Sequence, residues 1–198
     1  MQLGPPRLIT SVSGDEMPAM LYSIHEHKHR FSAWAAGRAA NVNGCRFSVR
    51  QAKAILEGAN LKQLLVGPDQ LPDPLQMDFT HREWRNTVIL LAKHQGLDMT
   101  HGVAAKLINI YLKAGFVCGG HDTDPRVQSL HPPIDGLLLE ELYHHDVGGL
   151  RAEWSKARAT RWSNFTSDQY ESVISSIRAA LGQNVPLWEI EQYWRGYQ

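Results

Sequence analysis

The chain has 198 residues, of which 43% are hydrophobic and 20% are charged, and its 20 basic and 20 acidic side chains give a net charge of zero. This length fits one domain with a substantial core, and the charge balance argues against bulk, non-specific nucleic-acid binding while leaving room for a local basic face. The two cysteines, Cys45 and Cys118, exclude a four-thiolate metal cluster and a secreted disulfide framework.

No apolar run approaches the roughly 18 residues of a membrane span, and no signal peptide is visible. We therefore expect a cytoplasmic protein with no membrane span. Residues 1–14 predict a flexible N-terminal arm, and residues 15–198 predict a single helical domain.

Every predicted element is a helix, and the turns between helices are rich in Gly and Pro. Apolar residues at helical spacing predict helices over residues 15–40, 49–58, 81–94, 101–114, 136–145, 167–181 and 186–194. Residues 66–78 and 117–133 are predicted to be loops. Single N-caps are predicted at Ser48, Thr100 and Asp135, and capping boxes at Thr80–Glu83 and Thr166–Gln169.

Lys106 lies near the start of the predicted helix 101–114. The positive end of the helix dipole and burial among Val103 and Ile110 both oppose a charge on its amine. A neutral lysine amine is a nucleophile that can form a Schiff base with a carbonyl carbon. An ordinary surface lysine is the plainer interpretation of this residue alone, and its neighbours are what favour chemistry.

The segment Thr100-His101-Gly102-Val103 is a short turn between two predicted helices. Gly102 allows close approach of a backbone, and the free N–H groups at the start of the next helix can hold a phosphate. Such a helix–turn–helix can grip a DNA strand without reading its bases. An ordinary helical corner is the alternative interpretation.

Asp135 follows Pro132 and Pro133 and opens the predicted helix 136–145. As an N-cap, its carboxylate would accept backbone hydrogen bonds. In a cleft, the same carboxylate could steady a cationic sugar transition state or help to deprotonate the lysine. Capping alone is the alternative explanation for this residue.

The sequences GVAAKLI (residues 102–108) and PID (residues 133–135) resemble two elements of the helix-hairpin-helix DNA glycosylase/lyases, in particular the 8-oxoguanine branch. These elements are the hairpin lysine and the proline–hydrophobic–aspartate motif. The resemblance implies that Lys106 attacks C1′ of a flipped-out damaged nucleotide and that Asp135 assists. It implies removal of an oxidised purine such as 8-oxoguanine, AP-lyase cleavage of the strand, and no need for a cofactor or metal.

The sequence departs from the family in three respects. Ala104-Ala105 stands where a second glycine usually precedes the lysine, and the spacing of 29 positions from Lys106 to Asp135 is longer than in many members. The family's extra β-sheet domain is missing. The resemblance therefore implies a compact all-α form, a two-lobed helical bundle with a helix-hairpin-helix element and an interlobe cleft. The expected partner is damaged double-stranded DNA, bound by a monomer.

The segment 151–162 contains four cations against one acid. Arg158 and Arg161 share a helical face and are predicted to contact backbone phosphates, with Trp154 or Trp162 stacking on a base. A solvated basic helix with tryptophans in the core is the alternative.

Two other function classes remain open. His25, Glu26 and His29 satisfy the H-E-x-x-H pattern of zinc hydrolases, with Glu26 as base. Lys28 would place a cation between the two ligands, so we expect no metal there. The six tryptophans also fit a non-catalytic helical module that binds DNA or a protein, with Trp194 on a terminal helix.

Overall fold

The computed structural model describes residues 22–197, so the predicted arm over residues 1–14 and the start of the first predicted helix lie outside the described residues. About 71% of the chain is helical, and the described part has no strand and one isolated bridge, between Val42 and Cys45. The predicted all-α fold is therefore confirmed.

The helices follow one another with short connections. The α-helices of the described residues are α1 (Ile24–Ala39), α2 (Val49–Gly58), α3 (Leu61–Leu64), α4 (Met77–His94), α5 (His101–Leu112), α6 (Pro125–Gln128), α7 (Gly136–His144), α8 (Arg151–Ala159) and α9 (Ser167–Leu181). The 3-10 turns are η1 (Pro68–Gln70), η2 (Pro74–Gln76), η4 (Val147–Gly149), η5 (Trp162–Asn164) and η6 (Leu187–Tyr193). A π-helical segment, η3 (Lys113–His121), extends α5.

Short polar side chains set most of the helix starts, as predicted. Each side chain accepts a hydrogen bond from the backbone N–H three residues later, which satisfies a donor that has no partner within the helix. The confirmed caps are Ser48 on α2, Thr100 on α5, Asp135 on α7 and Thr166 on α9.

The predicted capping box at Thr80 is wrong, because α4 begins at Met77 and Thr80 lies inside it. The helical path begins before Thr80, at the turn η2, where Asp73 is the N-cap and Pro74 the first residue. The chain runs from η2 directly into α4. The predicted loop over residues 117–133 is also wrong in part. The helical path continues to His121, and a further short helix, α6, follows it.

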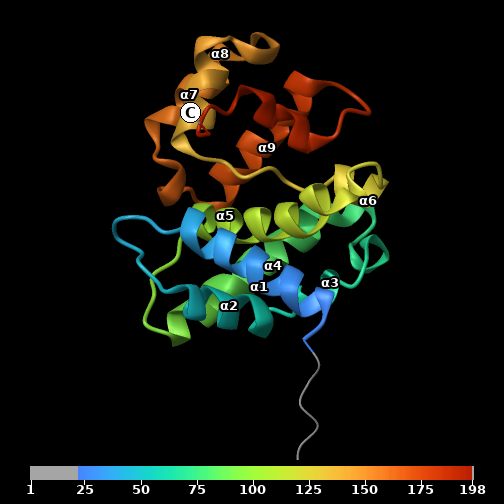
Figure 1. Cartoon of the computed structure of the whole chain (residues 1–198). Coiled ribbons are helices and arrows are strands. Elements are labelled where there is room, and N and C mark those ends of the chain that lie inside the picture. Colours follow the sequence, from blue (N-terminus) through green and yellow to red (C-terminus); the bar gives the residue numbers. More distant parts are fainter. Residues whose placement is uncertain (1–21, 198) are drawn as a thin grey trace, which may run out of the picture.

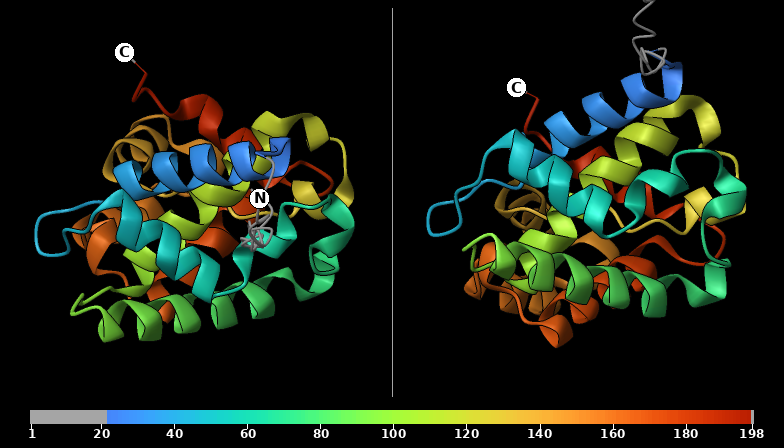
Figure 2. Two further views of the ribbon diagram at one scale, coloured as in Figure 1. Left: turned by 60° about the horizontal axis from the view of Figure 1, so that its bottom comes forward. Right: turned by 90° about the horizontal axis from the view of Figure 1, so that it is seen from below.

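The helices form two halves that meet along α5. Figure 1 shows α1 to α5 in the lower half and α7 to α9 in the upper half. α5 packs against α1, α4 and α9. Figure 2 shows from two other sides that α1 (blue) lies across α5 (yellow-green). α5 thus touches both halves.

Buried apolar side chains form two clusters. Residues of α5 such as Leu107 belong to the cluster with α1, α2 and α4, while Leu138 and Trp154 belong to the cluster of α7 to α9. The expectation that no apolar run approaches the length of a membrane span is wrong, because the segment His101–His121 is long and apolar enough by length and composition. Within the fold, 67% of its most apolar window is buried. Its place between the two clusters accounts for its apolar character.

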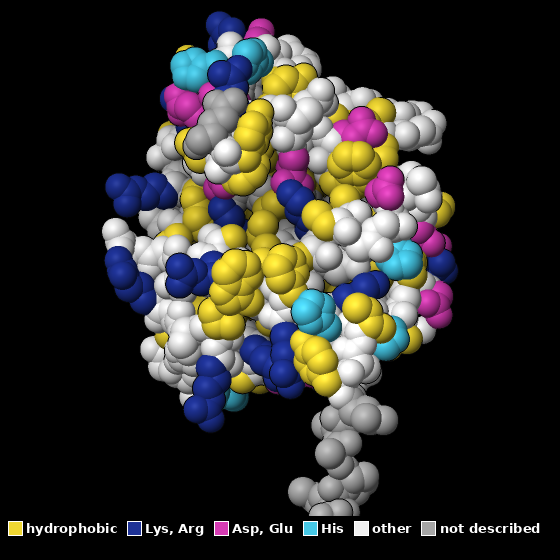
Figure 3. Space-filling model, in the orientation of Figure 1, with side chains coloured by type: hydrophobic (Ala, Val, Ile, Leu, Met, Phe, Trp, Pro, Cys, Tyr) yellow, Lys and Arg dark blue, Asp and Glu magenta, His cyan; other side chains and the backbone are white. Residues whose placement is uncertain are grey.

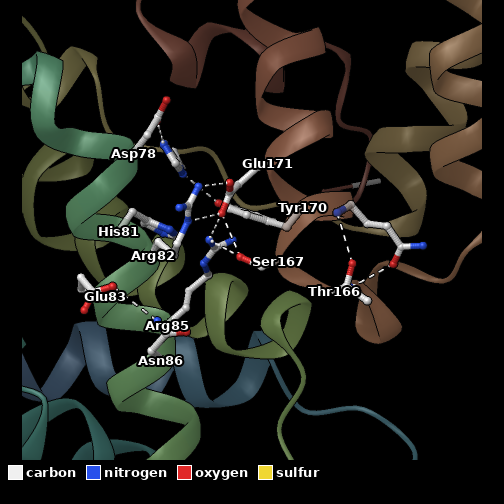
Figure 4. A network of polar contacts seen from close by, with 12 residues as sticks. Asp78, His81, Arg82, Glu83, Arg85, Asn86, Thr166, Ser167, Tyr170 and Glu171 are labelled. Atoms are coloured by element: carbon white, nitrogen blue, oxygen red, sulfur yellow. Dashed lines mark hydrogen bonds and ion pairs between the residues drawn. The ribbon is translucent and has the colours of Figure 1, made fainter.

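Polar contacts also join the two halves. Glu171 of α9 accepts hydrogen bonds from Arg82 (2.8 Å) and from the fully buried Arg85 (2.6 Å), both on α4, and Figure 4 shows the three side chains converging. The Arg85 guanidinium also lies 4.4 Å from the ring centre of Tyr170. These contacts fix α4 against α9.

Candidate functional site

The structure brings Lys106 and Asp135 into direct contact where α5 meets the start of α7. The Lys106 Nζ donates a hydrogen bond to Oδ2 of Asp135 at 3.0 Å. The two side chains are only 9% and 16% exposed, so this is a largely buried ion pair. Removing either partner would leave the other charge with little compensation in a poorly solvated place.

The Asp135 carboxylate has further partners that hold it in one orientation. Its Oδ1 accepts the Leu138 backbone N–H at 2.9 Å, which is the N-cap contact of α7. Its Oδ2 accepts the indole N–H of Trp194 at 3.0 Å. The cap turns one oxygen toward the helix, and the lysine and the indole share the other. Asp135 therefore both caps α7 and faces the amine.

Trp162 flanks the amine beside this carboxylate. The Lys106 Nζ lies 4.5 Å from the centre of the Trp162 ring, a distance at which a cation is attracted to the aromatic face. Trp162 also lines a hollow of about 430 Å³ together with Gly136, the residue next to Asp135. The hollow thus reaches the immediate neighbours of both charged residues.

A second ion pair follows along the same helical path. Lys113 contacts Glu191 of η6, and burial raises the pKa of the Glu191 carboxyl above its usual range. Its Oε1 is buried and has no hydrogen-bond partner in the described part of the chain. No sequence pattern indicated that Glu191, Trp162 and Trp194 lie here, because η5 and η6 reach α5 only through tertiary packing.

The predicted DNA-binding hairpin is covered by η5 and the residue after it. The Thr100 hydroxyl donates to the Ser163 carbonyl at 2.6 Å, and the Gly102 N–H donates to the Phe165 carbonyl at 3.3 Å. The Val103 N–H is bonded to the Thr100 hydroxyl at 3.2 Å. The N–H groups of Gly102 and Val103 are therefore already used within the chain and are not free for a phosphate.

His101 of the hairpin is half-buried, and its Nδ1 has no hydrogen-bond partner in the described part of the chain. Gly102 itself is packed so closely that a Cβ there would lie 1.8 Å from the Trp162 carbonyl oxygen. Its place in the fold is explained by this contact between α5 and η5.

The two arginines predicted to bind phosphate have different surroundings. Arg158 donates two hydrogen bonds of 2.7 Å to Glu140 and lies 4.1 Å from the ring centre of Tyr143. Arg161 is exposed and lines the hollow beside Trp162. The charge of Arg158 is therefore neutralised by Glu140, whereas the charge of Arg161 faces the hollow.

The tryptophans of the same segment differ in the same way. Trp154 is fully buried and donates its indole N–H to the Val147 carbonyl at 2.9 Å, so it is a core residue that does not reach a base. Trp162 is only partly buried and lies at the hollow.

His131 and His29 have their hydrogen-bond partners away from the amine. His131 hydrogen-bonds to Asp78 at 2.7 Å and to the Tyr170 hydroxyl at 3.1 Å, inside the contacts between α4 and α9. Both ring nitrogens of His29 are engaged, with the Tyr111 hydroxyl at 2.7 Å and with Glu57 at 3.1 Å. His29 therefore has no free nitrogen to join a metal site.

Figure 3 shows hydrophobic side chains gathered at the middle of one face, near the boundary of the two halves, with Lys and Arg side chains along its left margin.

Comparisons of the chain with protein-family models, with curated proteins and with solved structures found no match. The site combines a buried primary amine, an oriented carboxylate and an aromatic wall beside an open hollow.

Proposed function

We propose that the protein is a DNA glycosylase with AP-lyase activity, which removes a damaged base such as 8-oxoguanine through a Schiff base on Lys106. The observation that supports this best is the 3.0 Å contact between the buried Lys106 amine and the Asp135 carboxylate, beside the hollow lined by Trp162. A lysine and a carboxylate in contact are the two groups that such a reaction needs.

The carboxylate has a defined task in the proposed reaction. In this reaction the amine becomes a nucleophile when its proton passes to Asp135 across this hydrogen bond. The neutral amine attacks C1′ of the sugar, the bond from C1′ to the base breaks, and the base leaves with the bonding electrons and takes up a proton. The nitrogen then loses a proton, the C1′–O4′ bond breaks with O4′ taking up a proton, and the nitrogen lone pair forms the C=N bond of the imine between Lys106 and C1′.

Binding of the target nucleotide belongs to the same proposal. The two halves act as lobes, and the hollow between them receives a nucleotide that has rotated out of the duplex. Its volume of about 430 Å³ lies in the range typical of ligand sites. Trp162, Leu139 and Gly136 would form the wall next to the reacting carbon, with no cofactor required.

A non-catalytic DNA- or protein-binding module is the second candidate. The observation that favours it is that the ion pair also joins α5 to α7, which a purely structural pair would do as well. The two candidates differ in one measurable respect, because only the glycosylase forms a covalent imine with DNA.

The test is borohydride trapping with duplexes that contain 8-oxoguanine or an abasic site. Borohydride reduces an imine to a stable amine, so the wild-type protein should become cross-linked to DNA. Lys106→Gln retains a polar side chain of similar length without a nucleophilic amine, and it should abolish trapping. Lys113→Gln is the matched control, since Lys113 lies on the same helical path and also contacts a carboxylate, and it should still trap.

A Lys106→Gln protein that still cross-links, or that cleaves damaged DNA at the wild-type rate, would remove the assignment of the nucleophile. Wild-type protein that binds damaged duplex and never traps would favour the binding module. Circular dichroism of each variant checks that the helices are intact.

A further inference from the structure

A second hollow continues the one beside the Lys106–Asp135 pair. It has a volume of about 400 Å³ and is lined by Arg38 at the end of α1 and by Arg46 in the loop after it. The two hollows share Val42 and Asn43, so they adjoin each other at this loop, and we call the two hollows together the depression. A ligand that fills the first hollow can therefore extend along the loop to α1.

The depression has an excess of positive charge. In residues 22–197, no acidic side chain forms an ion pair with Arg38, Arg46 or Arg161, although Arg46 donates to the Asn43 amide oxygen at 2.6 Å. The one acid that lines the two hollows is Glu140, and Arg158 already neutralises it. Unpaired arginines in a hollow present their planar, fork-shaped donors to an anion such as phosphate.

Two exposed aromatic rings lie on α1, the helix that carries Arg38. Phe31 is 56% exposed and Trp34 is 51% exposed, and their ring centres lie 5.8 Å apart. Residues 31, 34 and 38 are spaced three and four apart, so both rings share a helix face with Arg38. Large aromatic side chains left in solvent beside cations suit stacking on nucleobases.

We propose that duplex DNA lies across this surface, which we name the α1–loop face and define by Phe31, Trp34, Arg38, Arg46 and Arg161. The arginines contact backbone phosphates, and the aromatic pair stacks on bases exposed where the target nucleotide leaves the helix. This inference rests on the proposed function, and it moves the expected DNA contact from the covered hairpin 100–103 to the α1–loop face.

The chemistry of the face favours a nucleic acid over other anionic partners. A bilayer surface presents phosphates without bases, whereas a DNA strand presents both. Stacking rings beside phosphate-binding cations match both parts of a nucleotide. The occupant is therefore a DNA strand whose target nucleotide can enter the adjoining hollow.

The test uses fluorescence anisotropy of the full-length protein with an undamaged labelled duplex at several salt concentrations. Arg38→Ala/Arg46→Ala should weaken binding by about tenfold or more and lower the slope of log affinity against log salt by about two. The control is Lys93→Ala/Lys156→Ala, which removes the same charge from exposed positions that line neither hollow, and it should bind within about twofold of wild type.

The aromatic pair is tested with a duplex that contains a stable abasic-site analogue, where base stacking is open to the protein. Phe31→Ala should weaken binding by about fivefold or more. Phe79→Ala is the matched control, because Phe79 is 62% exposed on α4 and outside the face. Equal binding by the Phe31→Ala and Phe79→Ala variants would overturn the stacking role.

The inference is overturned if Arg38→Ala/Arg46→Ala binds like wild type, if the lysine control loses as much affinity, or if phosphatidylserine vesicles bind the protein and duplex DNA does not. These outcomes separate it from the proposed function. Duplex binding through the face with no borohydride trapping would remove the glycosylase and leave the DNA-binding face. If Arg38→Ala/Arg46→Ala traps DNA at the wild-type yield, the glycosylase stands and the DNA-binding face is removed.

Discussion

Lys106 and Asp135 illustrate how few groups define the site. Two nearly buried charges in contact cost desolvation, and such pairs are often no better for stability than apolar residues of the same size. The Trp194 N–H and the Trp162 ring add polar partners, so the two charges keep one arrangement in the resting protein. The Leu138 N–H, the Trp194 N–H and the Trp162 ring thus hold the two charged groups in place, as the proposed reaction requires of a nucleophile and its base.

Asp135 has two separable roles, and two substitutions distinguish them. Asparagine still accepts the Leu138 N–H as a helix cap but cannot take up a proton, so Asp135→Asn should slow borohydride trapping by about 100-fold or more. Asp135→Ala loses the cap as well, and urea denaturation should show it to be about 1 kcal/mol less stable than Asp135→Asn. Trapping by Asp135→Asn at the wild-type rate would limit Asp135 to capping.

At the scale of elements, η5 determines what the start of α5 can do. It takes a hydrogen bond from the Thr100 hydroxyl and lies against Gly102, so this helix start is packed inside the protein. The same packing puts Trp162 over the Lys106 amine. The contact between η5 and α5 thus occupies the N–H groups that a phosphate would need, and it also places Trp162 as one wall of the candidate active site.

The contact between α5 and η5 can be tested at Gly102. A Cβ at this position would lie 1.8 Å from the Trp162 carbonyl oxygen, a backbone atom that cannot move away cheaply. Gly102→Ala should therefore lower the free energy of unfolding by about 2 kcal/mol or more, measured by urea denaturation.

Gly136 is the matched control, because it lies in the first turn of α7 and a Cβ there would have no neighbour within 4 Å. Gly136→Ala should be neutral or slightly stabilising, since alanine favours helix. If Gly102→Ala were as stable as Gly136→Ala, η5 would not be packed on α5 as described.

Across the whole molecule, a buried polar network connects α4, α5 and α9. His81 hydrogen-bonds to the Asn109 amide oxygen at 2.7 Å, and Asn109 donates to the Tyr170 hydroxyl at 2.9 Å. Tyr170 in turn lies 3.1 Å from His131, which hydrogen-bonds to Asp78. Burial lowers the pKa of both histidines, and the hydrogen bond from His131 together with Arg178 lowers the pKa of Asp78.

These shifts predict that acid destabilises the fold. The folded state keeps His81 and His131 neutral, whereas the unfolded chain takes up their protons once the pH falls below about 6.5. Stability is therefore complete above that pH, and the two histidines should remove about 2 kcal/mol by about pH 5.5. Because the pKa of Asp78 is lowered in the folded state, protonation of this carboxyl removes further stability at lower pH. Thermal denaturation between about pH 8 and about pH 5.5 measures the loss.

His81→Gln removes one titrating group and retains an amide N–H that can donate to Asn109, so it should flatten the fall of melting temperature with acid. His94→Gln is the control, because His94 is exposed on the same helix. A His81→Gln protein with the wild-type pH dependence would show that this network does not set acid stability.

The sequence by itself determined the local structure of the chain. Ser48, Thr100, Asp135 and Thr166 each cap the predicted helix, because capping depends on a side chain and a backbone N–H only three residues apart. The all-α class follows from helical spacing of apolar residues. The predicted start of α4 is wrong because two start signals, Asp73 and Thr80, lie only seven positions apart.

Only the tertiary structure decided which charges are free and which groups meet. Arg158 and Arg161 look equivalent in the sequence, yet Glu140, 18 positions away from Arg158, neutralises only that one. The sequence singled out Lys106 and Asp135, while their 3.0 Å contact and the neighbouring indoles of Trp162 and Trp194 depend on how α5, α7, η5 and η6 pack. Side chains far apart in sequence meet according to helix packing, which local patterns do not encode.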